Sequence, residues 1–165
     1  MTAADLIRAL ELIPHPEGGW FRETYRAGEV IPASALPARY SGPRAHATAI
    51  HFLLEAGQFS AFHRLNSDEL WFHEAGGTLD LWRIDPQGRL HTERLGPAAG
   101  RWQAMFPRGH WFAARPAADA AYAMVGCTVA PGFDFADFEL AERNALCAQY
   151  PAHRDLIERL TRTTP

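Results

Sequence analysis

Cysteine is scarce in this sequence, which has only Cys127 and Cys147 among its 165 residues and no CxxC pair. Two isolated thiols cannot build the disulfide framework of a small secreted protein, and their spacing matches no thiolate metal site. A basic amino-terminal segment followed by a long apolar core is also missing, as is any apolar run long enough to span a membrane. We therefore expect no signal peptide, no transmembrane helix and a location in the reducing cytoplasm.

An excess of positive charge is absent as well. The formal net charge is -3 and the pI is about 6.2, so the chain has no basic field that would attract nucleic acid or an anionic membrane. Its composition, 47% apolar and 21% charged, is ordinary for a globular protein. A chain of this length buries roughly 70% of its unfolded surface. We expect residues 1–165 to form a single domain.

The amino-terminal part of the chain predicts a helix, a strand and a loop. Apolar residues recur at helical spacing over about residues 3–13, and the prolines and glycines of residues 14–19 end that helix. Large and polar side chains alternate over residues 20–26, which predicts a strand. Residues 28–43 contain three prolines and no periodic pattern, which is typical of a functional or mobile loop.

The middle of the chain reads as short strands separated by turns. An Asp-Pro-x-Gly sequence at residues 85–88 predicts a hairpin, because proline presets one corner of the turn and glycine accepts the left-handed one. About eight strands at such regular intervals predict a sandwich or barrel over about residues 20–130. The strands are expected at residues 48–54, 59–65, 69–74, 78–84, 90–95, 102–106, 111–114 and 121–130.

After residue 130 the pattern becomes helical. Apolar periodicity predicts helices over residues 137–149 and 151–161, packed on the outside of the barrel. Asp134, Asp137 and Glu139 are expected to start and cap the first of these helices, because negative charge is favourable at a helix amino terminus.

The strongest candidate site lies in residues 57–76. Strand alternation puts His63 on one face and, after a polar turn, puts Glu69, Trp71 and His73 together on one face. If these faces form the same inner wall, an imidazole and a carboxylate meet there. His63, oriented by Glu69 or another carboxylate, could then act as a general base or acid near neutral pH.

The same stretch carries a family resemblance. Its spacing, Gly57-x5-His63-x-Leu65-x3-Glu69-x6-Gly76, resembles the first motif of the cupin superfamily, G-x5-H-x-H-x3,4-E-x6-G. Residues 100–112 resemble the second motif loosely, with Phe112 where the third histidine belongs. Residues 14–25 and 125–135 closely resemble stretches of cupin family 5, long classed as a domain of unknown function. The resemblance implies an all-β, double-stranded β-helix (jelly-roll) barrel that is frequently dimeric, and it implies no established reaction.

The resemblance also raises the question of a metal. A typical cupin site carries three imidazoles and one carboxylate, a set that suits Fe, Mn, Ni or Zn. By the resemblance, His63 and Glu69 occupy two of these four positions, whereas Leu65 and Phe112 cannot coordinate a metal. A divalent ion would need a further ligand, and His73 is the best substitute because it is in phase with Glu69. Metal-assisted chemistry therefore stays open as one alternative.

The metal-free alternative uses the same residues for acid–base chemistry. The chain resembles, at the level of the superfamily, an epimerase branch of the cupins in which an inward histidine removes a proton next to a carbonyl. Tyr25 or Tyr122 could supply the opposite proton. An aromatic-lined cavity would favour a sugar, a nucleoside or another flat small molecule. The candidate ligand contacts are Trp71, His73, His51, Tyr25 and Phe112.

Each of these residues also has a purely structural interpretation. His63 could be a core histidine bonded to the backbone, and large aromatic residues are common in barrel cores. Structural or surface roles are expected for His51, His73 and His110. Solvated or loop positions are expected for His15, His46, His91 and His153.

Two functional hypotheses follow. In the first, the protein is an enzyme that acts on a small polar metabolite (a sugar, a nucleotide-sugar or an organic acid) by proton transfer or weakly metal-assisted chemistry through His63 and Glu69. In the second, it is a non-catalytic small-molecule-binding cupin with a degenerate metal site. Retention of His63 with Glu69 favours the first, and loss of two ligand positions favours the second. We also expect a homodimer, in which an exposed strand near Trp20 could pair across the interface.

Overall fold

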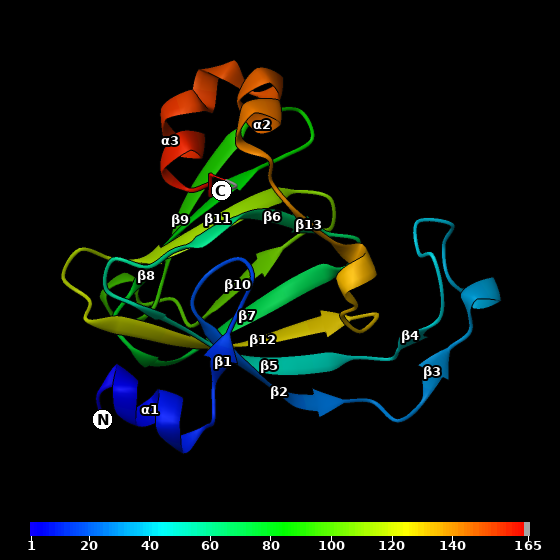
Figure 1. Cartoon of the computed structure of the whole chain (residues 1–165), viewed down its shortest axis with the longest axis horizontal. Coiled ribbons are helices and arrows are strands. Elements are labelled where there is room, and N and C mark those ends of the chain that lie inside the picture. Colours follow the sequence, from blue (N-terminus) through cyan, green and yellow to red (C-terminus); the bar gives the residue numbers. More distant parts are fainter. Residues whose placement is uncertain (164–165) are drawn as a thin grey trace.

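The computed structural model describes residues 1–163 and consists of two antiparallel sheets packed face to face (Figure 1). The six-stranded sheet has the order β1 (Ile13–Pro14), β2 (Trp20–Arg26), β5 (Thr48–Glu55), β12 (Tyr122–Ala130), β7 (Asp68–Gly76) and β10 (Gln103–Phe106). The five-stranded sheet has the order β13 (Phe138–Leu140), β6 (Ser60–Leu65), β11 (Trp111–Pro116), β8 (Leu79–Ile84) and β9 (Leu90–Leu95). This arrangement is the jelly-roll barrel that the sequence predicts.

The main core fills the space between the two sheets. It follows the alternation of each strand, because side chains of one parity along a strand share one face. Along β5, for example, Phe52 and Leu54 point into this core while Leu53 faces the other way. Apolar residues from both sheets complete it, including Trp71, Leu81 and Phe112.

Helices cover the outside of the sheets. The helices α2 (Arg143–Gln149) and α3 (Arg154–Arg159) lie together over the five-stranded sheet, at the top of Figure 1. They bury a second apolar cluster against that sheet, which includes Leu146, Ile157 and Trp111. The helix α1 (Ala3–Ala9) packs Leu6 against Leu53 on the outer side of the six-stranded sheet. No helix within residues 1–163 is both long enough and apolar enough to cross a membrane.

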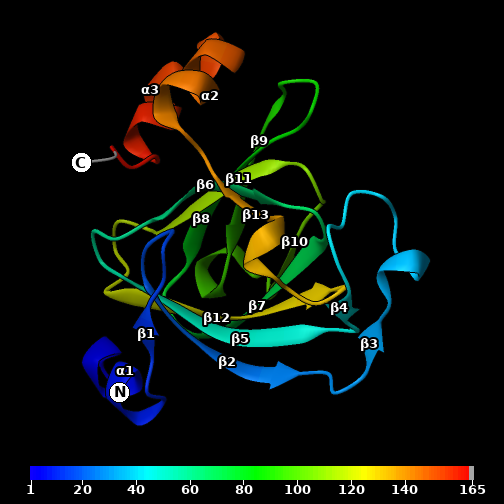
Figure 2. The ribbon, with the colours of Figure 1, turned by 45° about the vertical axis from the view of Figure 1, so that its right-hand side comes forward.

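The loop predicted over residues 28–43 has local structure and firm attachments. It contains the strand β3 (Val30–Ile31), which pairs with β4 (Arg44–Ala45), and a 3-10 turn at Ala33–Ala35. These elements project to one side of the barrel in Figure 2. The hydroxyl groups of Tyr40 and Ser67 lie 2.8 Å apart and join the loop to the β6–β7 turn.

The first carboxy-terminal helix begins later than the sequence predicts. Residues Phe138–Leu140 form β13 and pair with β6, and α2 begins only at Arg143. Asp137 does not cap α2, because its carboxylate accepts two hydrogen bonds from the buried Arg44 guanidinium, at 2.6 and 2.7 Å. The cap of α2 is instead Glu142, whose carboxylate accepts backbone N–H groups of the first turn.

Candidate functional site

A pocket of about 280 Å³ opens between the two sheets. Both sheets contribute to its wall, as do the β1–β2 loop and the segment after β12. Much of the lining is aromatic, from Phe21, Phe52, Trp71, Phe133, Phe135 and Phe138. Its acid and base groups are His15, Glu17, Glu23, Arg26, His63, Glu69 and Asp134. The pocket is therefore mainly apolar with a few titratable groups, the usual character of a small-molecule site.

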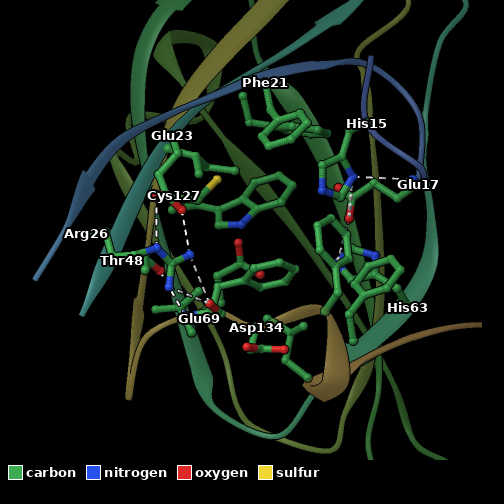
Figure 3. A pocket seen from close by; sticks show the side chains of 18 residues that line it. His15, Glu17, Phe21, Glu23, Arg26, Thr48, His63, Glu69, Cys127 and Asp134 are labelled. Carbon is green, nitrogen blue, oxygen red and sulfur yellow. Dashed lines mark hydrogen bonds and ion pairs between the residues drawn. The ribbon is translucent and has the colours of Figure 1, made fainter. Parts of the chain in front are cut away.

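Three titratable side chains gather on one side of the pocket (Figure 3). The Oε2 atom of Glu17 lies 3.2 Å from Nε2 of His63 and 3.5 Å from Nδ1 of His15. The other carboxyl oxygen of Glu17 accepts a hydrogen bond from the Ser60 hydroxyl at 2.8 Å. Both carboxyl oxygens of Glu17 thus have partners: Oε2 lies between two imidazoles, and the other oxygen accepts the Ser60 hydroxyl.

The β1–β2 loop delivers His15 and Glu17 to this position. Gly18 and Gly19 follow them with φ angles of +112° and +74°, a backbone conformation that L side chains rarely adopt. A Cβ atom at Gly19 would lie 2.6 Å from the carbonyl oxygen of Leu53. The Arg162 guanidinium also donates hydrogen bonds to the carbonyl oxygen of Glu17, at 3.0 and 3.2 Å. The Pro-Glu-Gly-Gly sequence therefore forms a tight turn that is fixed against the barrel.

Backbone contacts set the tautomers of the two histidines. Nδ1 of His63 lies 2.7 Å from the carbonyl oxygen of Ala61, so Nδ1 carries the proton and Nε2 presents a lone pair toward Glu17. The backbone N–H of Glu17 donates to Nδ1 of His15 at 3.3 Å, which leaves the His15 proton on Nε2. A neutral His63 therefore offers an acceptor to Glu17, and a neutral His15 keeps one donor free for the pocket.

Burial favours the neutral form of all three groups. It lowers the pKa of His63 to about 3 and the pKa of His15 to about 4. It also raises the pKa of Glu17 well above its ordinary value, and the negative charge of Glu69 adds to this effect. Because the pKa of Glu17 is raised and that of His63 is lowered, a single proton shared by this pair resides on Glu17.

Glu69 lies apart from this cluster and has an environment of its own (Figure 3). It is 7% exposed, and burial raises its pKa to about 7, with Trp71 and the Cys127 thiol opposing the shift. A carboxyl group with this pKa is present in both protonation states near neutral pH. The Trp71 indole N–H lowers the pKa of Glu69 as a donor facing its carboxyl group, although no acceptor lies within direct hydrogen-bonding distance of it in residues 1–163. This buried donor therefore favours the ionised form of Glu69.

Arg26 is the only basic residue, Lys or Arg, that lines the pocket in the described part of the chain. Its guanidinium donates two hydrogen bonds to Glu23, at 3.0 and 2.7 Å, and contacts the carbonyl oxygen of Phe133 at 3.2 Å. Asp134 also lines the pocket and adds a further acidic group. The charge of Arg26 is thus neutralised within the protein.

Comparison with known proteins identifies the family. The model of the family Cupin_5, described as "Cupin superfamily (DUF985)", matches residues 4–141. The chain belongs to this cupin family. Comparison with the curated proteins finds no match.

Solved structures agree with the assignment to the cupins. A Shewanella oneidensis protein is 40% identical, with 99% of both chains covered and a TM-score of 0.88. A hypothetical protein from Leishmania major is 32% identical, with 99% of this chain and 100% of that chain covered, also at a TM-score of 0.88. An oxalate decarboxylase variant from Bacillus subtilis is 16% identical over 92% of this chain and 40% of that one, at a TM-score of 0.55. This last similarity concerns the fold alone.

The pocket does not fit the metal site of a typical cupin. Both nitrogens of His63 are engaged, with Ala61 and Glu17, and the Phe112 ring lies with its centroid 4.0 Å from that of His63. Leu65 lines the pocket with a side chain that has no donor atom. Within residues 1–163, no three His, Cys, Asp or Glu side chains are arranged to hold a metal ion.

His63, Glu69 and Trp71 line one pocket, but the structure does not bring His73 and His51 to it. His73 lies farther along β7, where Nε2 contacts the carbonyl oxygen of Gly77 at 2.9 Å. His51 is one residue away from pocket-lining residues on β5, so alternation turns it outward, and its Nδ1 lies 2.8 Å from Glu74. Neither histidine therefore lines this pocket.

Tyr25 and Phe112 also lie outside the lining. The pairing of β2 with β5 shifts register between Glu23 and Tyr25, so the inward parity passes from Glu23 to Arg26. Tyr25 is 55% exposed as a result. Phe112 is 1% exposed and belongs to the main core behind His63.

The sequence interpretation missed His15 and Glu17. The expectation that His15 is a solvated loop residue is wrong, because its side chain is 7% exposed and stands edge-on to Phe21, with ring centroids 4.6 Å apart. The available signal was an imidazole and a carboxylate enclosed by prolines and glycines in Pro14–Gly19. Such a turn holds its side chains in fixed positions, which is unusual for a solvated loop.

Proposed function

We propose that this cupin is an enzyme that moves a proton on a small polar metabolite bound in the pocket. The observation that carries the proposal is the pairing of buried acid–base groups around one cavity, with Glu17 at 3.2 Å from His63 and with Glu69 apart from that pair. Groups of this kind, with pKa values displaced by burial, are enriched at catalytic sites.

Glu69 is the general base of the proposed reaction. Its pKa of about 7 means that it is partly ionised at neutral pH and basic enough to accept a proton from a carbon next to a carbonyl. The proton moves from that carbon to a Glu69 carboxyl oxygen, and the electron pair of the C–H bond passes to the carbonyl oxygen. The Nε2–H group of neutral His15, which lines the pocket, is available to a ligand oxygen.

The Glu17–His63 pair is the proton donor on the other side. Protonated Glu17 gives its proton to the substrate, and the resulting carboxylate is stabilised by the Ser60 hydroxyl. Donation to a carbon completes an isomerisation or an epimerisation without any change in oxidation state. Because the 16 basic residues of the sequence are all arginines, a Schiff base with a lysine side chain is excluded.

The second candidate is binding without chemistry. It is favoured by the fact that His63 has both ring nitrogens engaged with the protein, at 2.7 Å to Ala61 and 3.2 Å to Glu17. In this case the pair would shape the pocket rather than react.

The decisive experiment is hydrogen exchange into a bound ligand. Ligands are first selected by thermal shift from a panel of small polar metabolites, because a molecule that binds the folded state raises the melting temperature. Each one is then incubated with the protein in D₂O, and incorporation of deuterium at carbon is followed by NMR. We expect incorporation with the wild-type protein, and a loss of roughly 100-fold or more with Glu69→Gln or Glu17→Gln.

The matched control is His46→Ala, which removes an exposed imidazole outside the pocket and should exchange at the wild-type rate. His63→Ala should lose exchange while it still binds the ligand. A ligand that binds in the pocket and gains no deuterium over long incubation would support the second candidate. Full exchange by Glu69→Gln would remove Glu69 from the proposed mechanism.

A further inference from the structure

The charged side chains that line the pocket indicate which class of ligand it can bind. Four carboxyl groups line the cavity, those of Glu17, Glu23, Glu69 and Asp134. Arg26, the basic side chain of the described lining, is already bonded to Glu23 and to a backbone carbonyl. An anionic ligand would therefore meet carboxyl groups without a free cation to receive it, and like charges in a partly buried site repel strongly.

The aromatic part of the lining suits a cation. Six rings surround the cavity, from Phe21, Phe52, Trp71, Phe133, Phe135 and Phe138. The faces of such rings carry partial negative charge and attract ammonium groups, and carboxylates reinforce that attraction. Rings together with acids are thus complementary to an amine.

Glu69 is a buried acid with no cationic partner among residues 1–163. It is 7% exposed, and an ionised carboxylate at such a depth is costly unless a cation accompanies it. Glu69 is faced by Cys127 from β12, by Glu23 and Arg26 from β2, by His63 from β6, by His15 and Glu17 from the β1–β2 loop, and by Asp134 after β12. Because Arg26 is bonded to Glu23, a ligand ammonium group would supply the missing positive charge.

His15 adds a second requirement. It lines the pocket, and because its Nδ1 accepts the backbone N–H of Glu17, the neutral ring carries its proton on Nε2 (Figure 3). A ligand with a hydroxyl or carbonyl oxygen could accept a hydrogen bond from this group.

The size of the cavity favours a small ligand. Its volume of about 280 Å³ is just below the ~300 Å³ at which small-molecule sites begin. A single ring or a short chain fits this volume.

We propose that the pocket takes a small cationic amine that carries at least one oxygen acceptor, such as an amino alcohol or an amino sugar. Organic acids and phosphorylated sugars are disfavoured. This inference rests on the proposed function only in that it uses the same pocket. An amine that also carries a carbonyl group, as an amino sugar does in its open-chain form, is a molecule on which the proton transfer would act.

The test compares ligands that differ in charge and little else. Isothermal titration calorimetry is run with choline, its neutral carbon analogue 3,3-dimethyl-1-butanol and the anion 3,3-dimethylbutanoate. A second set is glucosamine, glucose and glucuronate. We expect the cation to bind at least about tenfold more tightly than the neutral molecule in one or both sets, with no measurable binding of the anion. Equal or tighter binding of the neutral or anionic member in both sets, or no binding by any cation, would overturn the proposal.

The pH dependence and a variant test the role of Glu69. Choline keeps its charge at every pH, so its affinity should rise about tenfold between about pH 6 and about pH 8 as Glu69 ionises around its pKa of about 7. Glu69→Gln should abolish both this rise and the preference for the cation. Glu158→Gln, which removes an exposed carboxylate on α3, should retain both. Retention of both by Glu69→Gln would contradict the assignment.

The two proposals can fail separately. If a cation with a carbonyl group, such as glucosamine in its open-chain form, binds tightly but gains no deuterium in D₂O, the proton-transfer function is refuted and the ligand class is retained. Deuterium exchange into a neutral or anionic ligand that outcompetes the amines would support the proton-transfer function and refute the proposed ligand class.

Discussion

Replacing Glu69 by glutamine should make the protein more stable at neutral and alkaline pH. Burial raises the pKa of Glu69 from 4.5 to about 7. Between these two values the unfolded chain releases the proton while the folded chain retains it, so the free energy of unfolding falls as the pH rises. The stability contributed by protonated Glu69 is fully present below about pH 4.5 and is lost as the pH passes through about 7. Glutamine has the same shape and does not titrate.

The magnitude follows from the two pKa values. A difference of about 2.5 corresponds to about 3 kcal/mol, at about 1.4 kcal/mol for each tenfold change in proton affinity. The variant should therefore gain about 3 kcal/mol on the wild type between pH 4.5 and pH 8, with a plateau above the pKa of about 7. The charge of Glu69 also contributes to the raised pKa of Glu17, so its removal acts in the same direction.

The assay is urea denaturation at a series of pH values, followed by tryptophan fluorescence, with the wild type and the variant measured side by side. The difference between them isolates Glu69, because the other titrating groups are common to both proteins. Glu158→Gln is the control and should track the wild type, since this carboxylate is exposed. If the difference between Glu69→Gln and the wild type stayed constant from acid to alkaline pH, Glu69 would not be a buried acid with a raised pKa.

Three other features have measurable consequences. Asp137→Ala should lower the free energy of unfolding by about 3–5 kcal/mol because it leaves the Arg44 guanidinium buried without its partner, whereas Glu139→Ala, which removes an exposed carboxylate, should cost less than about 1 kcal/mol in the same denaturation assay. Gly19→Ala should destabilise the protein by about 1–3 kcal/mol, because its φ of +74° and a carbonyl oxygen at 2.6 Å leave no room for a Cβ atom. Gly28→Ala, with no atom within 4 Å of the added Cβ, should be nearly neutral, and equal effects of the two changes would contradict the argument. The expected homodimer should give a mass about twice the 18.4 kDa of the chain in light scattering, and a monomeric mass at micromolar concentration would refute it.

The barrel could be predicted from local patterns. Strand alternation and turn residues are encoded within a few positions, so the predicted strand at residues 20–26 coincides with β2, and that at residues 90–95 coincides with β9. The hairpin at Asp85 is also confirmed, with the Gly88 N–H donating to the Asp85 carbonyl at 2.8 Å. The start of the last helices was wrong, because pairing of β13 with β6 overrides the helical tendency of residues 138–140.

The predicted site residues also differ in whether local pattern or tertiary structure decides their position. His63, Glu69 and Trp71 reach one pocket because strand parity alone fixes their side. Tyr25 does not, because an irregularity in the pairing of β2 with β5 reverses the parity within one strand. His73 has the expected parity but the wrong depth along β7, and depth depends on which strands lie opposite.

The amino-acid sequence by itself determined most of the barrel strands, many of the turns between them, the cupin family and the presence of one imidazole and one acid in the motif of residues 57–76. These properties depend on neighbours in the chain, so they can be read without coordinates. Only the tertiary structure decided that Glu17, from a turn far away in the sequence, meets His63 inside the barrel. The reason is physical: burial and a shared cavity set the pKa values and the partners of these groups, and both arise when the two sheets close on each other.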